Sequence, residues 1–458
     1  MTQRSTTGLQ VSGHRFLLRR MAHALVRADV RMIDDPLRAQ SLSLIVGGVV
    51  TVIIVVVCAV LALFRPGGQL GDSPIVTVRE SGAMYVRVGD TLHPVPNLAS
   101  ARLVTATSTS PQPVSRRAVD TARRGPMLGI PGAPDVLANP LTTAESGWAV
   151  CDDGSATTVI AGTRPTLSQA AGNVLVVARD DIAASTYLLF DGHRARVDLR
   201  NAAVVRALGL EGVAPRAVSR VLLDTLPEVA EIAAPRIPHA GSAGPATLHG
   251  FPVGTVVRVP RAETSDLFVV LADGLQRIGR VAADLIRFTQ SHGRRDIADV
   301  EPAAVGAVPV VTRLPVTGYP ERGGVADEPV VCAHWQWSDE ASSASSAVVT
   351  ATTRPVTDPV TLAQADGAGP RVDAVDLPDG RSGFVRAAGV SGDGAAHGPL
   401  YVVNDAGVVF GIHDEEAAKR LGLTAPVPAP WPVIAHLPRG PQLSVAAASE
   451  ARDTISSP

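Results

Sequence analysis

The stretch from Ser41 to Phe64, SLSLIVGGVVTVIIVVVCAVLALF, contains no charged residue. At about 1.5 Å per residue, a helix of this length spans roughly 36 Å, which is enough to cross a hydrocarbon core of about 30 Å. A buried helix of a soluble core would show a polar stripe, and a signal peptide would have a shorter apolar region before a small-residue cleavage site. Neither pattern is present. The sequence therefore predicts a retained transmembrane helix at 41–64, with the rest of the chain on its two sides.

The distribution of basic residues predicts the orientation of this helix. Several arginines precede the span, namely Arg4, Arg15, Arg19, Arg20, Arg27, Arg31 and Arg38. After the span comes Arg65, and the next basic residue is Arg79. Because positively charged flanks stay in the cytoplasm, we expect a cytoplasmic N-terminus and roughly 390 residues outside.

The segment before the span, 1–40, has the pattern of an amphipathic helix. Between Ser12 and Met32, apolar residues recur at three- and four-residue steps, and most arginines fall on the other side. Such a helix fits either the anionic inner leaflet or a helix of a partner protein. Asp34-Asp35-Pro36 is expected to end it.

The outer part is too long for one core, so we expect two or more packed units. The net charge of -2 and the pI of about 6.6 give no reason to expect nucleic acid as a partner. Of the three cysteines, Cys58 lies in the span, which leaves Cys151 and Cys332 outside. An oxidising compartment favours a disulfide between these two, and the alternative is a pair of free buried thiols.

Four stretches of the outer part share one pattern. They begin at Met84, Tyr187, Leu267 and Leu400, and each has a short β-type run, a glycine-containing turn, a second short run and a helical segment. Asn97, Asn201 and Asp414 stand where a side chain would cap the helix, whereas the third copy has no such residue. An Ile-Pro or Leu-Pro pair follows each copy. The pattern predicts a β-hairpin plus helix of about fifty residues, present four times.

Between these copies, two further segments match each other. WAVC at 148–151 and VVC at 330–332 are each followed by Thr-Arg-Pro, at 163–165 and 353–355. The order predicts a tandem duplication of about 185 residues. Homologous strands that lie side by side in one sheet would place Cys151 near Cys332. We predict an α+β fold with repeats at 75–135, 183–240, 250–318 and 371–441, a central β domain made of 140–182 and 326–370, and a tail at 442–458.

The chain resembles EccB, the family of membrane components of type VII (ESX) secretion in mycobacteria and related actinobacteria. The resemblance rests on LQVSGHRFLLRRMAHALVRAD near the N-terminus, the span, GIPGAP at 129–134, WAVC at 148–151 and HLPRGPQLS at 436–444. It implies a single-pass inner-membrane subunit that assembles with EccC-, EccD- and EccE-type components. It also implies a periplasmic part of four repeats around a central domain closed by one disulfide. The family has carried an ATPase label.

The residues themselves do not favour catalysis. No G-x-x-x-x-G-K-[ST] loop is present, and Lys419, the only lysine, reads as a charge at a helix C-terminus. No G-x-S-x-G elbow occurs, and Asp152-Asp153 and Asp180-Asp181 read as turn formers more readily than as metal ligands. The outer histidines, including His193, His292, His334 and His413, lack ligand spacing, and Trp335 and Trp337 are expected in the core.

We therefore predict no catalytic, cofactor-binding or metal-binding residues and no cofactor. The favoured hypothesis is a structural, self-associating subunit of a secretion complex. The alternatives are an extracytoplasmic ATP-hydrolysing subunit and a membrane-anchored protein that binds cell-envelope material.

Overall fold

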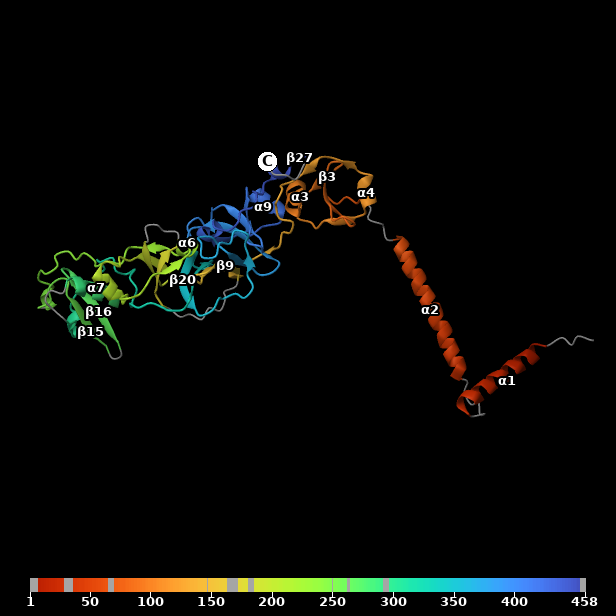
Figure 1. Cartoon of the computed structure of the whole chain (residues 1–458), viewed down its shortest axis with the longest axis horizontal. Coiled ribbons are helices and arrows are strands. Elements are labelled where there is room, and N and C mark those ends of the chain that lie inside the picture. Colours follow the sequence, from red (N-terminus) through yellow and green to blue (C-terminus); the bar gives the residue numbers. More distant parts are fainter. Residues whose placement is uncertain are drawn as a thin grey trace, which may run out of the picture. The chain divides into compact units, whose positions relative to one another are not determined.

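The computed structural model describes residues 7–28, 36–64, 70–145, 147–162, 172–179, 185–248, 250–261, 264–290 and 296–453. The chain is a mixed α/β protein with one long apolar helix near its N-terminus and a large, β-rich remainder. It divides into two compact units, 1–69 and 70–458, which are described separately below (Figure 1).

The first unit consists of helices α1 (Gly8–Arg27) and α2 (Pro36–Phe64). At the start of α1, the Gln10 side-chain oxygen accepts a hydrogen bond from the Thr7 amide at 3.2 Å, which satisfies one free donor of the first turn. The predicted arm helix thus begins earlier than Ser12 and ends at Arg27, before the expected Met32, because Ala28 adopts a left-handed conformation with φ 52°. Met32 and Asp34-Asp35 lie outside the described residues. Proline suits the first position of α2 because its missing N–H has no helical partner there.

Within α2, Leu42–Val60 is the segment of the described chain that is long and apolar enough to cross a membrane. Its large side chains are exposed. An apolar helix without a buried face has no packing of its own to stabilise it in water, so this exposure agrees with a lipid environment.

Four sheets of similar plan, one central sheet and a two-stranded sheet form the second unit. Sheet 1 contains β1 (Ile75–Val78), β2 (Met84–Val88), β3 (Thr91–Val95), β4 (Gln112–Val114) and β5 (Arg123–Arg124), in the order β4-β1-β2-β3-β5. Sheet 2 contains β10 (Val174–Ala178), β11 (Thr186–Phe190), β12 (His193–Arg196), β13 (Arg216–Val218) and β14 (Glu228–Val229), in the order β13-β10-β11-β12-β14.

Sheets 3 and 4 repeat most of this plan, with four strands in sheet 3 and five in sheet 4. Sheet 3 contains β15 (Val256–Pro260), β16 (Ser265–Leu271), β17 (Gly274–Ile278) and β18 (Ala298–Asp299). Sheet 4 contains β23 (Arg381–Ala388), β24 (Leu400–Val403), β25 (Val409–Ile412) and β26 (Val427–Pro430), and β7 (Asn139–Pro140) pairs with β23.

In each of these sheets an antiparallel meander leads into a helix and a parallel strand. The helices after the hairpins are α3 (Leu98–Thr105), α5 (Ala202–Leu208), α7 (Arg280–Thr289) and α9 (Glu415–Leu421). The predicted caps are confirmed, because Asn97, Asn201 and Asp414 each accept a backbone hydrogen bond at their helix start. As expected, the third helix has Gly279 at this position and no side-chain cap.

The central sheet has the strand order β20-β19-β8-β9-β22-β21. Its strands are β8 (Gly147–Asp152), β9 (Thr157–Gly162), β19 (Val330–Ser338), β20 (Ser343–Ala351), β21 (Val360–Thr361) and β22 (Ala374–Asp376). The sheet thus combines strands from both predicted central segments. The first Thr-Arg-Pro motif, 163–165, lies outside the described residues.

Two strands lie on the other side of the predicted boundaries. β10 belongs to sheet 2, although the sequence placed it in the central segment 140–182, because it pairs antiparallel with β11. β22 belongs to the central sheet, although it falls within 371–441, because it pairs parallel with β9. Both strands are short and buried, so their partners depend on long-range pairing rather than on local pattern.

Helix α3, which follows the hairpin of sheet 1, shares a hydrophobic core with sheet 4 and α9, and α7, which follows the hairpin of sheet 3, shares one with sheet 2 and α5. Helices α3 and α9 pack together, and the contact is reciprocal at their C-terminal ends. Arg102 of α3 donates to the Leu421 carbonyl at 2.9 Å, and Arg420 of α9 donates to the Leu103 carbonyl at 3.1 Å. Each arginine therefore satisfies a free carbonyl of the other helix.

The C-terminal segment packs onto sheet 1 rather than extending freely up to residue 453. Helix α11 (Val445–Ala448) contacts α3, and β27 (Ala451–Arg452) pairs with β6 (Met127–Leu128). Arg452 also donates to the Gly129 carbonyl at 3.1 Å. The last described residues therefore help to stabilise the first sheet of the unit.

Candidate functional site

The two outer cysteines lie directly opposite each other in the central sheet. Cys151 of β8 and Cys332 of β19 are register partners in an antiparallel pair, and a disulfide joins their Sγ atoms. Both residues are buried among apolar neighbours. The bond links positions separated by 181 residues, so it connects the two halves of the outer unit.

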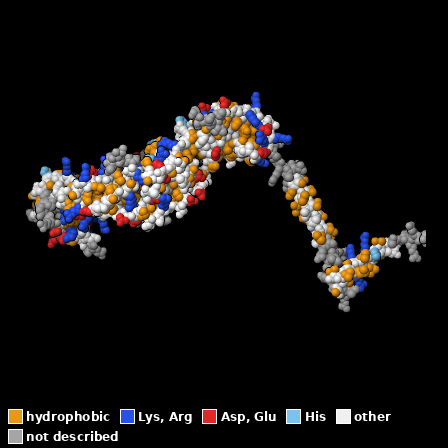
Figure 2. All heavy atoms as spheres, viewed as in Figure 1, with side chains coloured by type: hydrophobic (Ala, Val, Ile, Leu, Met, Phe, Trp, Pro, Cys, Tyr) orange, Lys and Arg blue, Asp and Glu red, His pale blue; other side chains and the backbone are white. Residues whose placement is uncertain are grey.

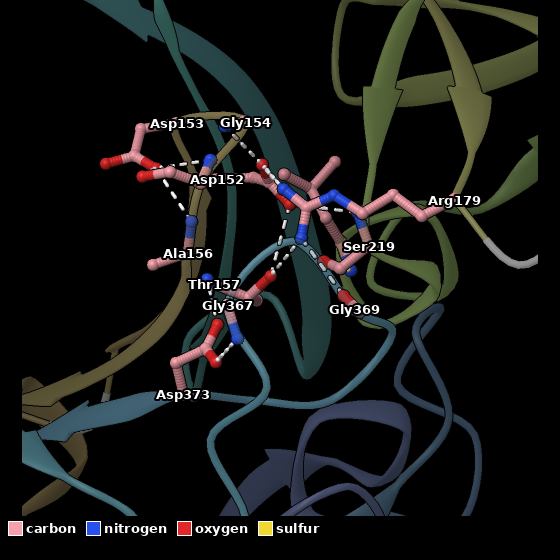
Figure 3. Close-up of polar contacts among 12 residues, drawn as sticks. Asp152, Asp153, Gly154, Ala156, Thr157, Arg179, Ser219, Gly367, Gly369 and Asp373 are labelled. Carbon is pink, nitrogen blue, oxygen red and sulfur yellow. Dashed lines mark hydrogen bonds and ion pairs between the residues drawn. The ribbon is translucent and has the colours of Figure 1, made fainter.

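A buried polar node follows Cys151 directly (Figure 3). The Asp152 carboxylate forms an ion pair with Arg179, and both side chains are almost completely buried. Asp152 also accepts hydrogen bonds from the backbone N–H groups of Gly154 and Ser219, each at 2.9 Å, and from the Thr157 hydroxyl at 3.1 Å. Since a buried charge is tolerated when it is paired and hydrogen-bonded, the complete set of donors explains why Asp152 lies here.

The Arg179 guanidinium connects this carboxylate to a neighbouring loop. It donates to the Gly369 carbonyl at 3.1 Å and contacts the Thr157 hydroxyl at 3.3 Å (Figure 3). On the same loop, Asp373 accepts hydrogen bonds from the amides of Thr157 and Gly367. The node therefore joins the end of β8, the end of β10 and the loop before β22.

Ser219 connects the node to the short helix α6 (Arg220–Asp224). While its amide donates to Asp152, its hydroxyl caps the helix by accepting from the Leu222 amide at 3.4 Å. One residue thus orients α6 relative to the central sheet. The node has a structural function, because every polar atom named here is engaged within the protein.

The other acidic candidate of this segment acts in the adjoining turn. Asp153 accepts hydrogen bonds from the Ser155 and Ala156 amides at 2.9 Å and pairs with Arg354. Burial raises the pKa of Asp153, but these hydrogen bonds outweigh it and lower the pKa to about 2. Asp153 is thus a turn former, as expected, and Asp152 combines a turn bond to the Gly154 amide with the buried ion pair to Arg179, which the sequence did not predict. Asp180-Asp181 lies outside the described residues.

Within the described part of the chain, no three His, Cys, Asp or Glu side chains come together in a group that could hold a metal ion. His193 contacts the Asp191 carbonyl of its own turn at 2.8 Å, and His413 is exposed. His334 is buried in β19, and His292 lies outside the described residues.

The tryptophans and the lysine also occupy structural positions. Trp335 is fully buried and its indole N–H donates to the Val390 carbonyl at 2.9 Å, while Trp337 packs against the same core. Lys419 lies in the last turn of α9. These positions confirm the sequence interpretation of all three residues.

A hollow of about 960 Å³ lies between sheets 2 and 3. Two of its arginines pair with acidic residues, Arg277 with Asp266 at 2.8 Å and Arg280 with Asp284 at 3.4 Å. Arg206, Asp191, Glu321 and Arg322 also line the hollow.

Comparison with known proteins places the chain in a family. The family model described as "Type VII secretion system ESX-1, transport TM domain B" matches residues 3–457. The curated protein "ESX-3 secretion system ATPase EccB3" of Mycolicibacterium smegmatis is 38% identical over 98% of this chain and 91% of its own length. "ESX-5 secretion system ATPase EccB5" of Mycobacterium tuberculosis is 36% identical over 98% of this chain and 94% of its own length.

Solved structures agree with these sequence matches. A chain in "Structure of an intact ESX-5 inner membrane complex" is similar with a TM-score of 0.71 and 33% identity, over 100% of this chain and 98% of that one. A chain in "Structure of EccB3 dimer from the ESX-3 core complex" is similar with a TM-score of 0.71 and 32% identity, over 83% of this chain and 100% of that one. The chain therefore belongs to the EccB family of type VII secretion systems.

Proposed function

We propose that the chain is a structural, single-pass inner-membrane subunit of a type VII secretion complex, with its N-terminus in the cytoplasm and residues 70–458 in the periplasm. The observation that carries the proposal is the full-length likeness to a subunit of an inner-membrane complex, together with one apolar helix whose side chains are exposed. The arginines before α2 support the orientation.

The four sheets support a repeat architecture around a duplicated central domain. Each contains a meander, a helix and a parallel strand, and helices α3 and α9, like α5 and α7, pair across two sheets. Small units of this kind bury their apolar faces by packing on their neighbours, and their outer faces remain available for contact with other proteins.

For the partners, we propose self-association and contact with EccC-, EccD- and EccE-type components. Self-association is supported by the likeness to the chain in the EccB3 dimer. The test is affinity purification of the tagged chain from membranes of a host that expresses the other components. Recovery of a stoichiometric membrane complex is expected, and recovery of this chain alone under conditions that preserve the complex would contradict the proposal.

The name of the curated relatives suggests ATP hydrolysis as a second function. The sequence has no phosphate loop of the G-x-x-x-x-G-K-[ST] type, and the buried node of Asp152 is already fully bonded. We therefore expect the purified full-length chain to hydrolyse ATP no faster than a matched preparation from cells that lack it. Turnover that one defined substitution in this chain abolishes would establish the enzyme.

A further inference from the structure

A short helix follows the parallel strand in each of the four outer sheets. These helices are α4 (Arg116–Asp120), α6 (Arg220–Asp224), α8 (Pro302–Gly306) and α10 (Trp431–Ile434). The copies in sheets 1 and 2 align without gaps: Ser115–Arg124 reads SRRAVDTARR and Ser219–Glu228 reads SRVLLDTLPE, with the same Ser-Arg start and the same Asp-Thr end of the helix. Both begin with a serine cap, end at a threonine and continue into a parallel edge strand.

The copies in sheets 2 and 4, α6 and α10, pack within the protein. In α6, Val221, Leu222 and Leu223 are buried in the core that includes the central sheet. In α10, Val433 and Ile434 are buried in the same core, and the two helices contact each other. The apolar residues of these copies are therefore explained by an internal partner.

The copies in sheets 1 and 3, α4 and α8, have no comparable buried face. Val119 is the one buried residue of α4, and α8 has none. The two differ in charge, since α8 reads Pro-Ala-Ala-Val-Gly, whereas α4 and the following strand carry two Arg-Arg pairs, at 116–117 and 123–124. An exposed helix alone does not require arginines, so the charge of the sheet 1 copy needs its own explanation.

Acidic neighbours neutralise only part of this charge. Asp120 pairs with Arg116 and Arg124, and Glu80 accepts a hydrogen bond from the Arg116 amide at 3.0 Å. Arg79 lies close by, because its amide donates to the Val114 carbonyl at 3.0 Å. Among the described residues, Arg79, Arg117 and Arg123 are exposed and form no ion pair. Figure 2 shows arginine side chains gathered at the α4 end of the second unit.

Among the four copies, α4 is also the one closest in sequence to the membrane-spanning helix α2. Leu70, the first described residue of the second unit, packs in the cluster that contains Val119, beside Ala122. Only residues 65–69 separate Leu70 from Phe64 at the end of α2, a covalent reach of about 20 Å. Of the two exposed copies, the basic one is therefore the copy closer in sequence to the membrane-spanning helix.

We propose that the arginine-rich face of α4 and β5 binds the anionic, phosphate-bearing lipid headgroups of the leaflet from which the chain emerges. The proposal rests on the membrane crossing of α2 in the proposed function. Each basic residue at an anionic surface shifts the equilibrium between bound and free states about fivefold. Loss of Arg79, Arg117 and Arg123 together should thus lower the bound-to-free ratio about a hundredfold.

The test uses the full-length chain in lipid nanodiscs and follows amide hydrogen exchange of 115–125. Exchange should be slower in discs of phosphatidylglycerol and phosphatidylcholine than in discs of phosphatidylcholine alone, and high salt should remove the difference by screening. The triple change Arg79→Gln, Arg117→Gln and Arg123→Gln should abolish it, while the three Arg→Lys changes should retain it, because lysine preserves the charge.

A matched control changes Arg236, Arg322 and Arg371, which are exposed and form no ion pair among the described residues, to glutamine. This variant has the same net charge as the first and should keep the protection. Equal exchange in both lipids, loss of protection in the control, or protection by inorganic phosphate in phosphatidylcholine discs would each overturn the lipid assignment. Whether the chain enters the discs tests the membrane crossing of α2 separately. A failure of the headgroup contact is therefore distinguishable from a failure of the membrane crossing.

Discussion

Replacement of Asp152 by asparagine removes one charge from the buried pair with Arg179 and preserves the shape of the side chain. The variant keeps one side-chain oxygen for the Ser219 amide, but its NH2 group cannot accept from the Gly154 amide or from Arg179. It therefore loses one hydrogen bond and the compensation of a guanidinium that is only 5% exposed. Breaking a buried pair by removing one partner costs about 3–5 kcal/mol, because the remaining charge is left in a low-dielectric environment.

This cost converts into a measurable melting shift. With about 2.1 cal/mol/K of unfolding entropy per residue over roughly 390 residues, 3–5 kcal/mol lowers the Tm by about 4–6 °C if the second unit unfolds as one body. If the sheets unfold separately, the entropy is smaller and the shift is larger. All four tryptophans, at 148, 335, 337 and 431, lie in this unit, so their fluorescence follows its unfolding in the full-length chain.

The decisive comparison is a double-mutant cycle. Arg179→Met in the Asp152→Asn background should cost clearly less than the sum of the two single changes, since neither charge then remains unpaired. Asp405→Asn, which makes the same chemical change at an exposed turn residue, serves as control. It should change the free energy of unfolding by about 0.5 kcal/mol or less, which is a Tm shift of about 0.6 °C or less. An Asp152→Asn variant as stable as this control, or strictly additive changes, would refute the assigned role of the node.

Three further predictions concern the covalent link, acid stability and the reciprocal arginines. Without reductant, the unfolded chain should present one titratable thiol, and three free thiols would exclude the disulfide. Cys151→Ser and Cys332→Ser should each lower the free energy of unfolding by an amount on the order of 4–5 kcal/mol through loop entropy, and the double variant should lose no more than either single variant. Hydrogen bonds from Arg381 lower the pKa of Glu145 from 4.5 to about 2, so its stabilisation is present above pH 4.5 and lost on acidification toward pH 2. Glu145→Gln should thus lower the Tm at pH 7 and match the parent at pH 2, and an equal deficit at both pH values would contradict this. Burial lowers the pKa of Arg102, and its Nε has no hydrogen-bond partner. Arg102→Met should therefore lower the free energy of unfolding in urea by about 1 kcal/mol or less. A larger decrease would show that the hydrogen bond from Arg102 to the Leu421 carbonyl outweighs the cost of burial.

Features that depend on neighbouring residues were predictable from the sequence. The span at 41–64 and the helix caps Asn97, Asn201 and Asp414 follow from such local chemistry. So do the hairpin turns: Gly192 has a positive φ of 76°, and an added Cβ would lie 2.0 Å from the Ser346 carbonyl oxygen, so glycine is required there. The opposite positions of Cys151 and Cys332 were also predicted, because a duplication carries its register in the sequence.

Only the tertiary structure decided which partners the remaining elements take. β10 and β22 are short apolar strands whose pattern suits several sheets, and their hydrogen-bonding partners lie elsewhere in the chain. Asp152 reads as a turn residue until β10 brings Arg179 beside it. The difference between α4 and α6 is visible only in the structure, because α6 packs against the central sheet while the arginines of α4 remain exposed. Local chemistry determines which helix or strand forms. Burial and charge pairing depend on residues that are far apart in the sequence, so these contacts cannot be read from one sequence without its fold.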